Sequence, residues 1–556
     1  MATESISQMI QEKARRFGPK LALCLSGDNI DEEYTYRALD QASGELATGF
    51  VRLGLKPGDR VALLCESRPR WGVVFFATIR AGAIVLPLDT HQTAGEIGHI
   101  LDDARPRFLL VCRGQEKLAA ELLRNHSDRL KVFSVEPVSA EPAFQSIDVI
   151  AGSEIHPCVE RAASDAAVLT YTSGTMGSAK GVVTTYGNLL YQIRTIRKVM
   201  QNDPHCTAVS ILPLSHLFEL TAGFLGILYG GGRICYCNSL LPGEIVAAMR
   251  EQQVTCMATV PLFLKLFAAA IRSQIDKQPR WRRALFRSLS RISGALPLAT
   301  RRRLFRKLHR CFGGQLEYFV SGGAPLDSKT LNFFESIGIP VYQGYGMAET
   351  SPVIASNSPA ANRAGSVGKP LPGIEVKIAG DGEILTRGPH VMRGYFENDA
   401  LTASVIDKDG WLHTGDIGHL DGDGFLHITG REKNVIVLAT GKKVQPEELE
   451  SVLFEHPDIE EGCVVGAMAH EGLMVDSEEV CAIAVASEEA VRRCTNGGEN
   501  LNNTIQHIIE ERARKVAPGK RPTRIVLRME SLPRTSTRKI RRPNVRQWLH
   551  NEAAMS

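Results

Sequence analysis

The order of the expected secondary structure is the feature that most limits how this chain can fold. Short runs rich in β-forming residues, at 60–65, 83–87 and 108–111, alternate with helical patterns such as the one at 37–53. The alternation continues in further β-rich runs at 209–212, 234–236, 256–260, 317–320 and 340–343. Strand, helix and strand in that order are typical of parallel sheets covered by helices. The sequence therefore predicts one large α/β body that extends to about residue 360.

The pattern changes after this body. Glycine-rich segments with short strands predict a small β-subdomain at about 365–429, and a charged, compact βα pattern follows from 430 onward. We therefore expect an α/β protein with two domains. The large N-terminal domain, 1–432, combines the α/β layers with the β-subdomain, and a small α+β C-terminal domain occupies 433–556.

Charge and hydropathy argue against several classes of protein. In 556 residues, 65 Lys and Arg stand against 61 Asp and Glu, a formal net charge of +4, and 44% of the residues are hydrophobic. This composition argues against a disordered chain and a polycationic nucleic-acid binder, so no nucleic-acid partner is expected. The 12 cysteines lack the paired spacing of redox or zinc motifs. Neither 1–20 nor the apolar stretches 73–88 and 214–229 resemble a signal or spanning segment, so we expect a cytoplasmic protein.

One segment, from Arg280 to Arg310, concentrates positive charge. It contains 11 Arg and Lys residues and no acidic residue. Its apolar residues recur at helical spacing, which predicts two basic amphipathic helices joined through Pro297. Such helices can cover the core with a solvated face, or can bind an anionic membrane surface or an acidic carrier partner. The sequence leaves these three interpretations open.

The first segment with a chemical signature is the glycine-rich run 171–181, which follows a strand expected at 166–169. Glycines let backbone N–H groups converge, hydroxyl groups add donors, and Lys180 supplies a positive charge. Such a loop suits a polyphosphate, although its spacing is not that of a Walker motif. An ordinary Gly/Ser turn is the alternative.

The second segment is 343–350, which leaves an expected strand and exposes an aromatic residue between two glycines. Tyr345 can stack on a base, Glu349 can hold Mg²⁺, and Thr350 can donate to a phosphate. A turn with a buried tyrosine is the alternative interpretation.

Two further segments place charges on turns. Asp416, on a tight glycine turn, can accept from vicinal ribose hydroxyls together with Arg431. A surface Asx turn is the alternative. Lys539, in the basic segment 532–540, can face a developing anion, whereas a solvated run of charges is the alternative.

In this order and at these separations, the four segments resemble those of the adenylate-forming superfamily of acyl-CoA synthetases, luciferases and adenylation domains. The resemblance extends from about Tyr34 to Arg541 and includes 321–326 and 441–450. It implies an enzyme in which a carboxylate attacks the α-phosphorus of MgATP and pyrophosphate leaves. A thiol, usually that of coenzyme A, then captures the acyl-adenylate. ATP, Mg²⁺ and coenzyme A are therefore the implied cofactors and co-substrates.

The resemblance also implies roles for individual residues. Glu349 would coordinate Mg²⁺, and Thr350 would contact the α-phosphate. Other nucleotide contacts would come from Thr172, Ser173, Gly174, Thr175 and Lys180 at the β- and γ-phosphates, from Gly322, Gly323, Ala324 and Tyr345 with its neighbour Gly346 around the adenine, and from Asp416 and Arg431 at the ribose.

In the superfamily the small C-terminal domain is mobile, and the resemblance places its hinge at Lys433. Lys539 would be catalytic, bridging the attacking carboxylate and the α-phosphate during adenylation. For thioester formation the domain would turn and present Gly441 and Lys442 to coenzyme A, and a side chain at Gly441 would narrow the pantetheine tunnel. The chain departs from the superfamily at Arg538, where a glycine usually precedes the lysine, so the mobility of this loop is expected to differ.

The segment 212–219 resembles the acyl-pocket motif of long- and medium-chain fatty acyl-CoA synthetases. Amino-acid-activating members carry an Asp there, so an apolar acid is favoured, with His216 as the gate of an acyl channel. The candidate lining residues are Leu214, Leu217, Phe218, Phe224 and Leu225. Plain core packing is the alternative for an apolar run at this spacing.

Three functions are consistent with these residues. The first is a fatty acid:CoA ligase, and the second is a fatty acyl-AMP ligase or acyl-ACP synthetase that delivers the acyl group to a separate carrier protein. The third is a catalytically inactive, lipid-binding relative. The intact set of Lys180, Glu349, Asp416 and Lys539 argues against the third.

Overall fold

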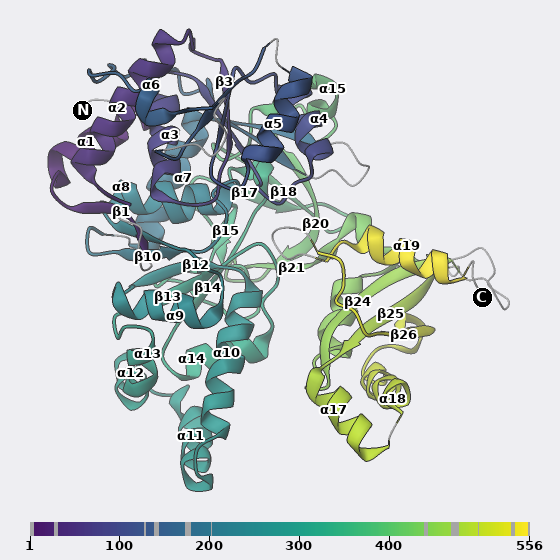
Figure 1. Ribbon diagram of the computed structural model, residues 1–556. Helices are drawn as coiled ribbons and strands as arrows, with labels where there is room; N and C mark the ends of the chain where they lie inside the picture. The colour runs from purple at the N-terminus through teal and green to yellow at the C-terminus, as the bar shows by residue number, and fades with distance from the viewer. Residues whose placement is uncertain are drawn as a thin grey trace. The chain divides into compact units, whose positions relative to one another are not determined.

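The computed structural model describes residues 5–26, 32–126, 129–137, 144–172, 179–201, 203–438, 443–468, 478–498, 500–534 and 540–553. The chain forms two compact units. Unit 1 comprises Met1–Val376 and Thr386–Leu412, and unit 2 comprises Lys377–Leu385 and His413–Ser556. Helices and strands alternate through unit 1, and unit 2 is α+β (Figure 1), so the predicted fold class is confirmed. The domain boundary that the sequence predicts between residues 432 and 433 marks the expected hinge, and it stays a prediction.

The first large sheet of unit 1 has eight strands in the order β19-β9-β8-β4-β3-β5-β6-β7. The strands from β8 to β7 are parallel to their neighbours, whereas β9 and β19 are antiparallel. The bounds are β3 (Arg60–Leu64), β4 (Ile84–Leu88), β5 (Phe108–Val111), β6 (Lys131–Ser134), β7 (Gln145–Ser146), β8 (Ala166–Thr172), β9 (Lys180–Thr185) and β19 (Gly394–Tyr395).

The second large sheet has nine strands in the order β16-β15-β14-β13-β12-β10-β11-β1-β2. Its six central strands, from β14 to β1, are parallel, as the alternation in the sequence predicts. The bounds are β1 (Leu21–Ser26), β2 (Glu33–Thr35), β10 (Thr207–Ser210), β11 (Arg233–Cys237), β12 (Cys256–Thr259), β13 (Tyr318–Ser321), β14 (Val341–Tyr345), β15 (Ala355–Ser356) and β16 (Lys369–Pro370).

Helix α3 (Pro69–Arg80) joins the two sheets. Every residue of α3 except Arg70 is buried, because the helix packs on β4 of the first sheet and on β1 of the second. Gly72 permits this approach, since a Cβ there would lie 2.8 Å from Leu23 Cδ1 and 3.2 Å from the ring of Phe224. The apolar character of α3 on all sides is therefore that of a helix between two layers.

The outer faces of the sheets are covered by further helices. Helices α4 and α5 pack on the first sheet, and α9, α10 and α14 pack on the second. The helices of unit 1 are α1 (Ile6–Phe17), α2 (Tyr36–Arg52), α4 (Ala94–Ala104), α5 (Glu116–His126), α6 (Ile147–Ile150), α7 (Tyr186–Met200), α8 (Gly226–Gly230), α9 (Pro242–Glu251), α10 (Pro261–Asp276), α11 (Arg280–Ser293), α12 (Leu298–Leu304), α13 (Arg306–Cys311), α14 (Ser328–Ser336) and α15 (Asp399–Ala403).

The basic segment forms three helices, α11, α12 and α13, and not the two that the sequence predicts. The second expected helix is interrupted at Phe305, whose backbone leaves the helical region at φ −100° and ψ 24°. Phe305 is buried and its ring lies 5.5 Å from that of Phe286, so tertiary packing of this side chain accompanies the break. Among the described residues, no helix is long and apolar enough to pass through a lipid bilayer.

Most of a four-stranded sheet, β17-β18-β20-β21, belongs to unit 2. The rest of the described part of unit 2 contains a two-stranded sheet, β22-β23, and a three-stranded sheet, β24-β25-β26, with the helices α16 to α19. The bounds are β17 (Glu375–Ile378), β18 (Glu383–Arg387), β20 (Leu412–Leu420), β21 (Leu426–Arg431), β22 (Ile436–Val437), β23 (Lys443–Val444), β24 (Ile459–Met468), β25 (Glu478–Ala486), β26 (Arg524–Arg528), α16 (Pro446–Leu453), α17 (Glu488–Gly497), α18 (Leu501–Ala513) and α19 (Arg542–Ala553).

Helices pack on both faces of the three-stranded sheet. Along β24, Val464 packs with α16 and α18 on one face, whereas Cys463 and Val465 pack with α19 on the other. An ion pair supports the edge of this core: Arg542 Nη2 lies 2.6 and 2.7 Å from the two carboxylate oxygens of Glu450. Burial raises the pKa of Glu450 to about 7, and the positive charge of Arg542 acts in the other direction and lowers it. The charged form of this carboxyl group thus depends on its partner.

Candidate active site

Strands β8 and β9 flank the glycine-rich segment. These strands are antiparallel, and Thr172 pairs directly with Lys180 at the base of the loop. The loop itself, 173–178, with the predicted phosphate-binding residues Ser173, Gly174 and Thr175, lies outside the described residues. The structure thus places Thr172 and Lys180 side by side.

Lys180 and Glu349 are brought together by a third residue, Tyr395. The Tyr395 hydroxyl donates to Glu349 Oε1 at 2.9 Å, and Lys180 Nζ lies 5.4 Å from the centre of the Tyr395 ring. Burial, with the charge of Glu349, raises the pKa of Tyr395, so the phenol remains a donor at neutral pH. Sequence reasoning missed Tyr395, because its position follows from the pairing of β19 with β9, for which the motif carries no signal.

The turn that carries Glu349 is stabilised by the hydroxyl group of Thr350 and by a side chain of α7. Thr350 is fully buried, and its Oγ1 accepts from Met347 N at 3.0 Å and lies 2.9 Å from Met347 O. Gln192 Nε2, from α7, donates to the carbonyl oxygen of Thr350 at 2.9 Å. Gly346 is required, since a Cβ there would lie 1.8 Å from Pro352 O. The contact of Thr350 with an α-phosphate stays a prediction, because this hydroxyl serves the turn here.

The predicted adenine residues follow neighbouring parallel strands. Thr259 at the end of β12 pairs with Ser321 at the end of β13, and Ser321 pairs with Gln343 in β14. Parallel strands end at one edge of a sheet, and ligands bind there in open α/β sheets. The loop Gly322, Gly323 and Ala324 therefore lies beside the end of β14, where Tyr345 is the last residue of the strand and Gly346 follows it. Gly322 N donates to Thr259 O at 3.1 Å, which fixes the start of the loop.

The acyl-pocket motif starts from the same edge, after β10. Ser67, which follows β3 of the first sheet, donates to Leu212 O at 3.1 Å and accepts from Leu214 N at 2.9 Å. His216 Nε2 lies 4.0 Å from Oδ2 of Asp89, which follows β4. The motif thus spans the carboxyl edges of both sheets. Asp89 was not among the predicted site residues, because nothing in its local sequence links it to His216.

The acyl-pocket motif adjoins the predicted adenine loop. A Cβ on Gly322 would lie 3.1 Å from the Phe218 ring, so the backbone of the loop packs against this aromatic residue. Of the other candidate lining residues, Phe224 packs in an aromatic cluster with Trp71 and Phe75, with ring centres 5.8 Å apart in both cases. Phe224 therefore belongs to the core, whereas Phe218 lies at the predicted site.

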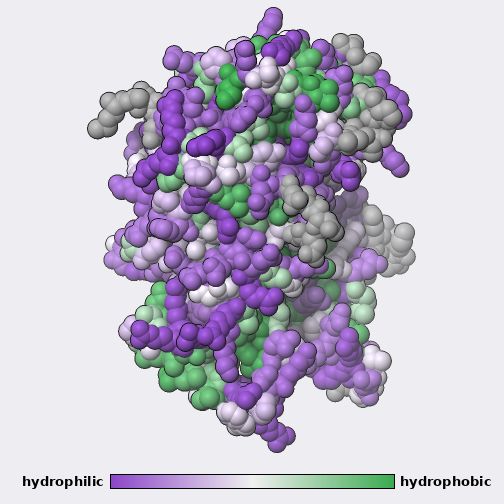
Figure 2. All heavy atoms as spheres, turned by 60° about the vertical axis from the view of Figure 1, so that its left-hand side comes forward, coloured by the Kyte–Doolittle hydropathy of each residue, from purple (hydrophilic) through white to green (hydrophobic). Residues whose placement is uncertain are grey.

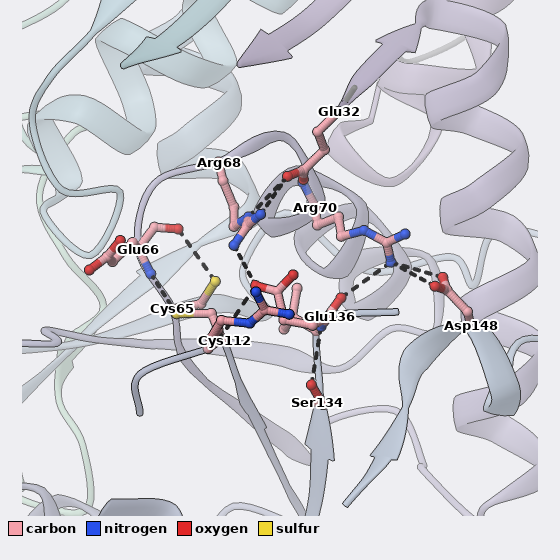
Figure 3. A network of polar contacts seen from close by, with 11 residues as sticks. Glu32, Cys65, Glu66, Arg68, Arg70, Cys112, Ser134, Glu136 and Asp148 are labelled. Carbon is pink, nitrogen blue, oxygen red and sulfur yellow. Dashed lines mark hydrogen bonds and ion pairs between the residues drawn. The ribbon is translucent and has the colours of Figure 1, made fainter. Parts of the chain in front are cut away.

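A network of ion pairs lies at another part of the edge of the first sheet (Figure 3). Arg68, after β3, lies 2.7 Å from Glu32 Oε2 and also pairs with Glu136, after β6. Next to it, Arg70 Nη1 lies 2.8 Å from Asp148 Oδ1. These charges are matched within the protein, so we assign this part of the edge a structural role.

Unit 2 carries the predicted ribose pair. Asp416 and Arg431 face each other across β20 and β21, with Asp416 Oδ1 2.8 Å from Arg431 Nε. Asp416 thus lies within β20 and not on the glycine turn that the sequence predicts, because the ladder with β21 extends to Asp416. Glu383 supports this part of β20: it accepts from Gly415 N at 2.8 Å and lies 2.7 Å from His413 Nδ1. Sequence reasoning missed Glu383. The predicted hinge residue Lys433 is exposed, in a single turn after β21.

The remaining predicted residues, Lys539, Gly441 and Lys442, lie outside the described residues. In the part of the chain that is described, no group of three or more His, Cys, Asp or Glu side chains could hold a metal ion. A lone carboxylate such as Glu349 nevertheless fits Mg²⁺, which is usually bound by one or two carboxylates together with substrate phosphates and water.

Comparison with known proteins places the chain in a family. Residues 10–396 match the model of the AMP-binding enzymes, and residues 448–539 match the model of the AMP-binding enzyme C-terminal domain. The first match alone covers more than half of the chain. The protein therefore belongs to the AMP-binding enzyme family, which confirms the resemblance to adenylate-forming enzymes seen in the sequence.

Individual relatives agree with this assignment. The chain is 31% identical over 488 residues to the long-chain-fatty-acid–CoA ligase FadD15 of Mycobacterium bovis, covering 79% of this chain and 76% of the relative. It is 28% identical over 444 residues to a feruloyl-CoA synthase of Amycolatopsis, covering 78% and 80%. The solved structure of ATP-bound MatB from Rhodopseudomonas palustris is 25% identical, with a TM-score of 0.78 and 98% of each chain covered. The predicted enzyme class, an AMP-forming acid–thiol ligase, is confirmed.

One buried carboxyl group beside the site has no role in the sequence prediction. Glu219 is 1% exposed and opens a π-helical turn, Glu219–Leu225, a feature that is frequent at functional sites. Ser210 donates to Glu219 Oε1 at 2.6 Å, and among the described residues Oε2 has no hydrogen-bond partner. Gly223 makes room, since a Cβ there would lie 2.5 Å from the carboxyl carbon. Complete burial raises the pKa of Glu219 to about 8.

The raised pKa makes stability depend on pH. The folded protein keeps the Glu219 proton at pH values where the unfolded chain has lost it, so the stabilisation is full below about pH 4.5 and is lost as pH rises through about 8. The full change is on the order of 5 kcal/mol. We expect Glu219→Gln to remove this dependence. The free energy of unfolding in urea, taken as the variant minus the natural protein, should therefore be more positive at pH 8.5 than at pH 5.5.

The control is Glu121→Gln, which changes an exposed glutamate of α5. Its unfolding free energy should follow that of the natural protein at both pH values. Parallel pH profiles for the natural protein and Glu219→Gln would contradict the raised pKa.

Proposed function

We propose that this enzyme is a fatty acid:CoA ligase. In the first half-reaction a carboxylate oxygen of the acid bonds to the α-phosphorus of ATP, and the bond to pyrophosphate breaks. In the second, the thiol of coenzyme A attacks the acyl carbon and AMP leaves. Similarity to the long-chain ligase FadD15 and the apolar motif at 212–219 support a fatty acid as substrate. The proposed place of action is the cytoplasm.

The observation that carries the proposal is the arrangement of Lys180, Tyr395 and Glu349 at the edge where the adenine and acyl motifs meet. Lys180 and the loop before it would bind the β- and γ-phosphates, and Glu349 would hold Mg²⁺, which supplies charge neutralisation when bound. Tyr395 keeps the Glu349 carboxylate in place. A preorganised set of charges of this kind stabilises a transition state without rearrangement during the reaction.

The residues of unit 2 would complete the reaction. Asp416 and Arg431 would bind the ribose hydroxyls, and Lys539 would bridge the attacking carboxylate and the α-phosphate. We further propose that the domain 433–556 turns about Lys433 between the half-reactions, so that Gly441 replaces Lys539 near the acyl group. Resemblance to the adenylate-forming superfamily supports this part of the proposal.

A second substrate class is an aromatic acid, and the similarity to a feruloyl-CoA synthase favours it specifically. We place it second because the acyl motif carries Leu214, Leu217 and Phe218, and the sequence match to the long-chain ligase is the stronger in identity. Delivery to an acyl carrier protein, in place of coenzyme A, remains the alternative for the acceptor.

The test is the product pattern of the purified enzyme with MgATP, coenzyme A and a mixture of acids from acetate to oleate together with ferulate. Mass spectrometry should detect AMP and the acyl-CoA of one class of fatty acid. Feruloyl-CoA as the main product would assign the aromatic class. Acyl-AMP that accumulates until an acyl carrier protein is added would assign the carrier-protein acceptor.

Replacing Tyr395, which contacts both Lys180 and Glu349, should impair adenylation. Tyr395→Phe removes the hydrogen bond to Glu349, and a bond to a charged group contributes roughly 1.5–3 kcal/mol. We expect kcat/KM for MgATP to fall by about 10- to 100-fold in a pyrophosphate-release assay. Tyr191→Phe is the matched control, because this hydroxyl donates to the carbonyl of Pro372 and should be dispensable. Equal losses in the two variants would show that Tyr395 does not position Glu349.

The two half-reactions should separate in variants of the C-terminal domain. Lys539→Ala should abolish formation of the acyl-adenylate, yet convert supplied acyl-adenylate and coenzyme A to thioester at close to the natural rate. Gly441→Leu should do the reverse, because its side chain narrows the path of the pantetheine arm. Each half-reaction is followed separately, by pyrophosphate release and by thioester formation. If both variants lose both half-reactions equally, the rotation proposed at Lys433 is wrong.

A further inference from the structure

Helix α11 leaves an apolar stripe in solvent. The helix packs on the core of the second sheet through Phe286 and Leu289. Trp281, Leu285 and Ile292, at positions i, i+4 and i+11, form the adjoining part of the same apolar sector, next to Leu289. These three side chains are 63%, 51% and 59% exposed, respectively, which excludes a core role for them. The next helix, α12, adds two more exposed leucines, Leu298 and Leu304.

Another side of α11 carries only positive charge. Arg280, Arg283, Arg287 and Arg291 recur at i, i+3, i+7 and i+11, which places them in one stripe. In the described ranges of the chain none of the four forms an ion pair. The apolar stripe and the arginine stripe are therefore both available to a partner outside the chain.

The whole segment around these two stripes is positively charged. The segment 280–310 carries +11 of a total net charge of +4, which leaves −7 for the rest of the chain. Some of its arginines have structural partners: Arg301 donates to Glu335 O at 2.9 Å, and Arg302 donates to Glu317 O at 2.7 Å. Figure 2 shows hydrophobic and hydrophilic side chains next to one another at the lower end of that view.

We propose that α11 and α12 bind an anionic lipid surface. An apolar stripe flanked by arginines is the arrangement of a helix that lies in the membrane interface, with apolar side chains among the lipids and guanidinium groups at the phosphates. Trp281 fits such a position, because an indole ring has an apolar body and a polar N–H. An acidic protein partner would match the arginines but would not account for the exposed Trp281, Leu285 and Ile292.

This proposal deepens the proposed function and rests on it only for its biological purpose. Fatty acids of long chain partition into bilayers, so an enzyme held at the lipid surface would meet its substrate at high local concentration. Binding to vesicles needs neither ATP nor coenzyme A. If the protein does not bind vesicles, the proposed ligase reaction can still be correct. If the substrate is of a different class, the proposed binding to anionic lipid can still be correct.

The experiment is co-sedimentation of the full chain with phosphatidylcholine vesicles, with and without phosphatidylglycerol. We expect binding only to the anionic vesicles. Trp281→Ser combined with Leu285→Ser, and separately Arg287→Gln combined with Arg291→Gln, should each weaken binding at least tenfold while acyl-CoA synthesis from a soluble acid stays unchanged. Arg113→Gln combined with Lys117→Gln is the matched control, because it removes two exposed cations near α5. This control should bind like the natural protein.

Tryptophan fluorescence gives an independent measurement. Of the four tryptophans, Trp281 is the exposed one, and Trp71 is buried. Anionic vesicles should shift the emission to shorter wavelength, and Trp281→Phe should abolish the shift. Three results would overturn the proposal: no binding, equal weakening by the control pair, or vesicle binding that is insensitive to the apolar pair. Tight binding of an acidic carrier protein without vesicle binding would assign this surface to a protein partner.

Discussion

The parallel register of β10, β12, β13 and β14 is the constraint on which the candidate site depends. Parallel strands end at the same edge of a sheet, so the loops that follow them meet, however far apart they lie in the sequence. The pairing of Thr259 with Ser321, and of Ser321 with Gln343, fixes the level at which each loop begins. A shift of one residue in either pairing would turn the side chains to the other face and move the loops apart.

The loops at this edge are positioned by polar contacts to backbone atoms. Ser67 binds both Leu212 and Leu214, and Gln192 binds the turn that carries Glu349. Because these contacts satisfy backbone groups that would otherwise be buried without partners, each loop has one favoured conformation. The charges of the site can then be held in place before a nucleotide arrives, which is the condition for electrostatic catalysis.

The parts of this picture that the sequence predicts are the local ones. The parallel strands followed from alternating patterns, and Lys180, Glu349 and Asp416 followed from motifs that each occupy one short segment of the sequence. Tyr395 and Asp89 were missed, because each reaches its partner through strand pairing or sheet packing between distant segments. The π-helical turn at Glu219 was missed for another reason: in sequence it is an apolar run with one acid, and the raised pKa arises only from complete burial.

Helix α11 shows why an apolar pattern at helical spacing predicts contact but not the partner. In the sequence, Trp281, Leu285, Phe286, Leu289 and Ile292 form one broad apolar sector. The core of the second sheet covers only Phe286 and Leu289, since the helix extends beyond the sheet that supports it. Exposing the other three costs free energy in water, because each large apolar side chain gains roughly 1.5–3 kcal/mol on burial. Within the described part of the chain, the arginines beside this sector, Arg280, Arg283, Arg287 and Arg291, form no ion pair. The uncovered sector is therefore best explained by a second surface that completes the burial.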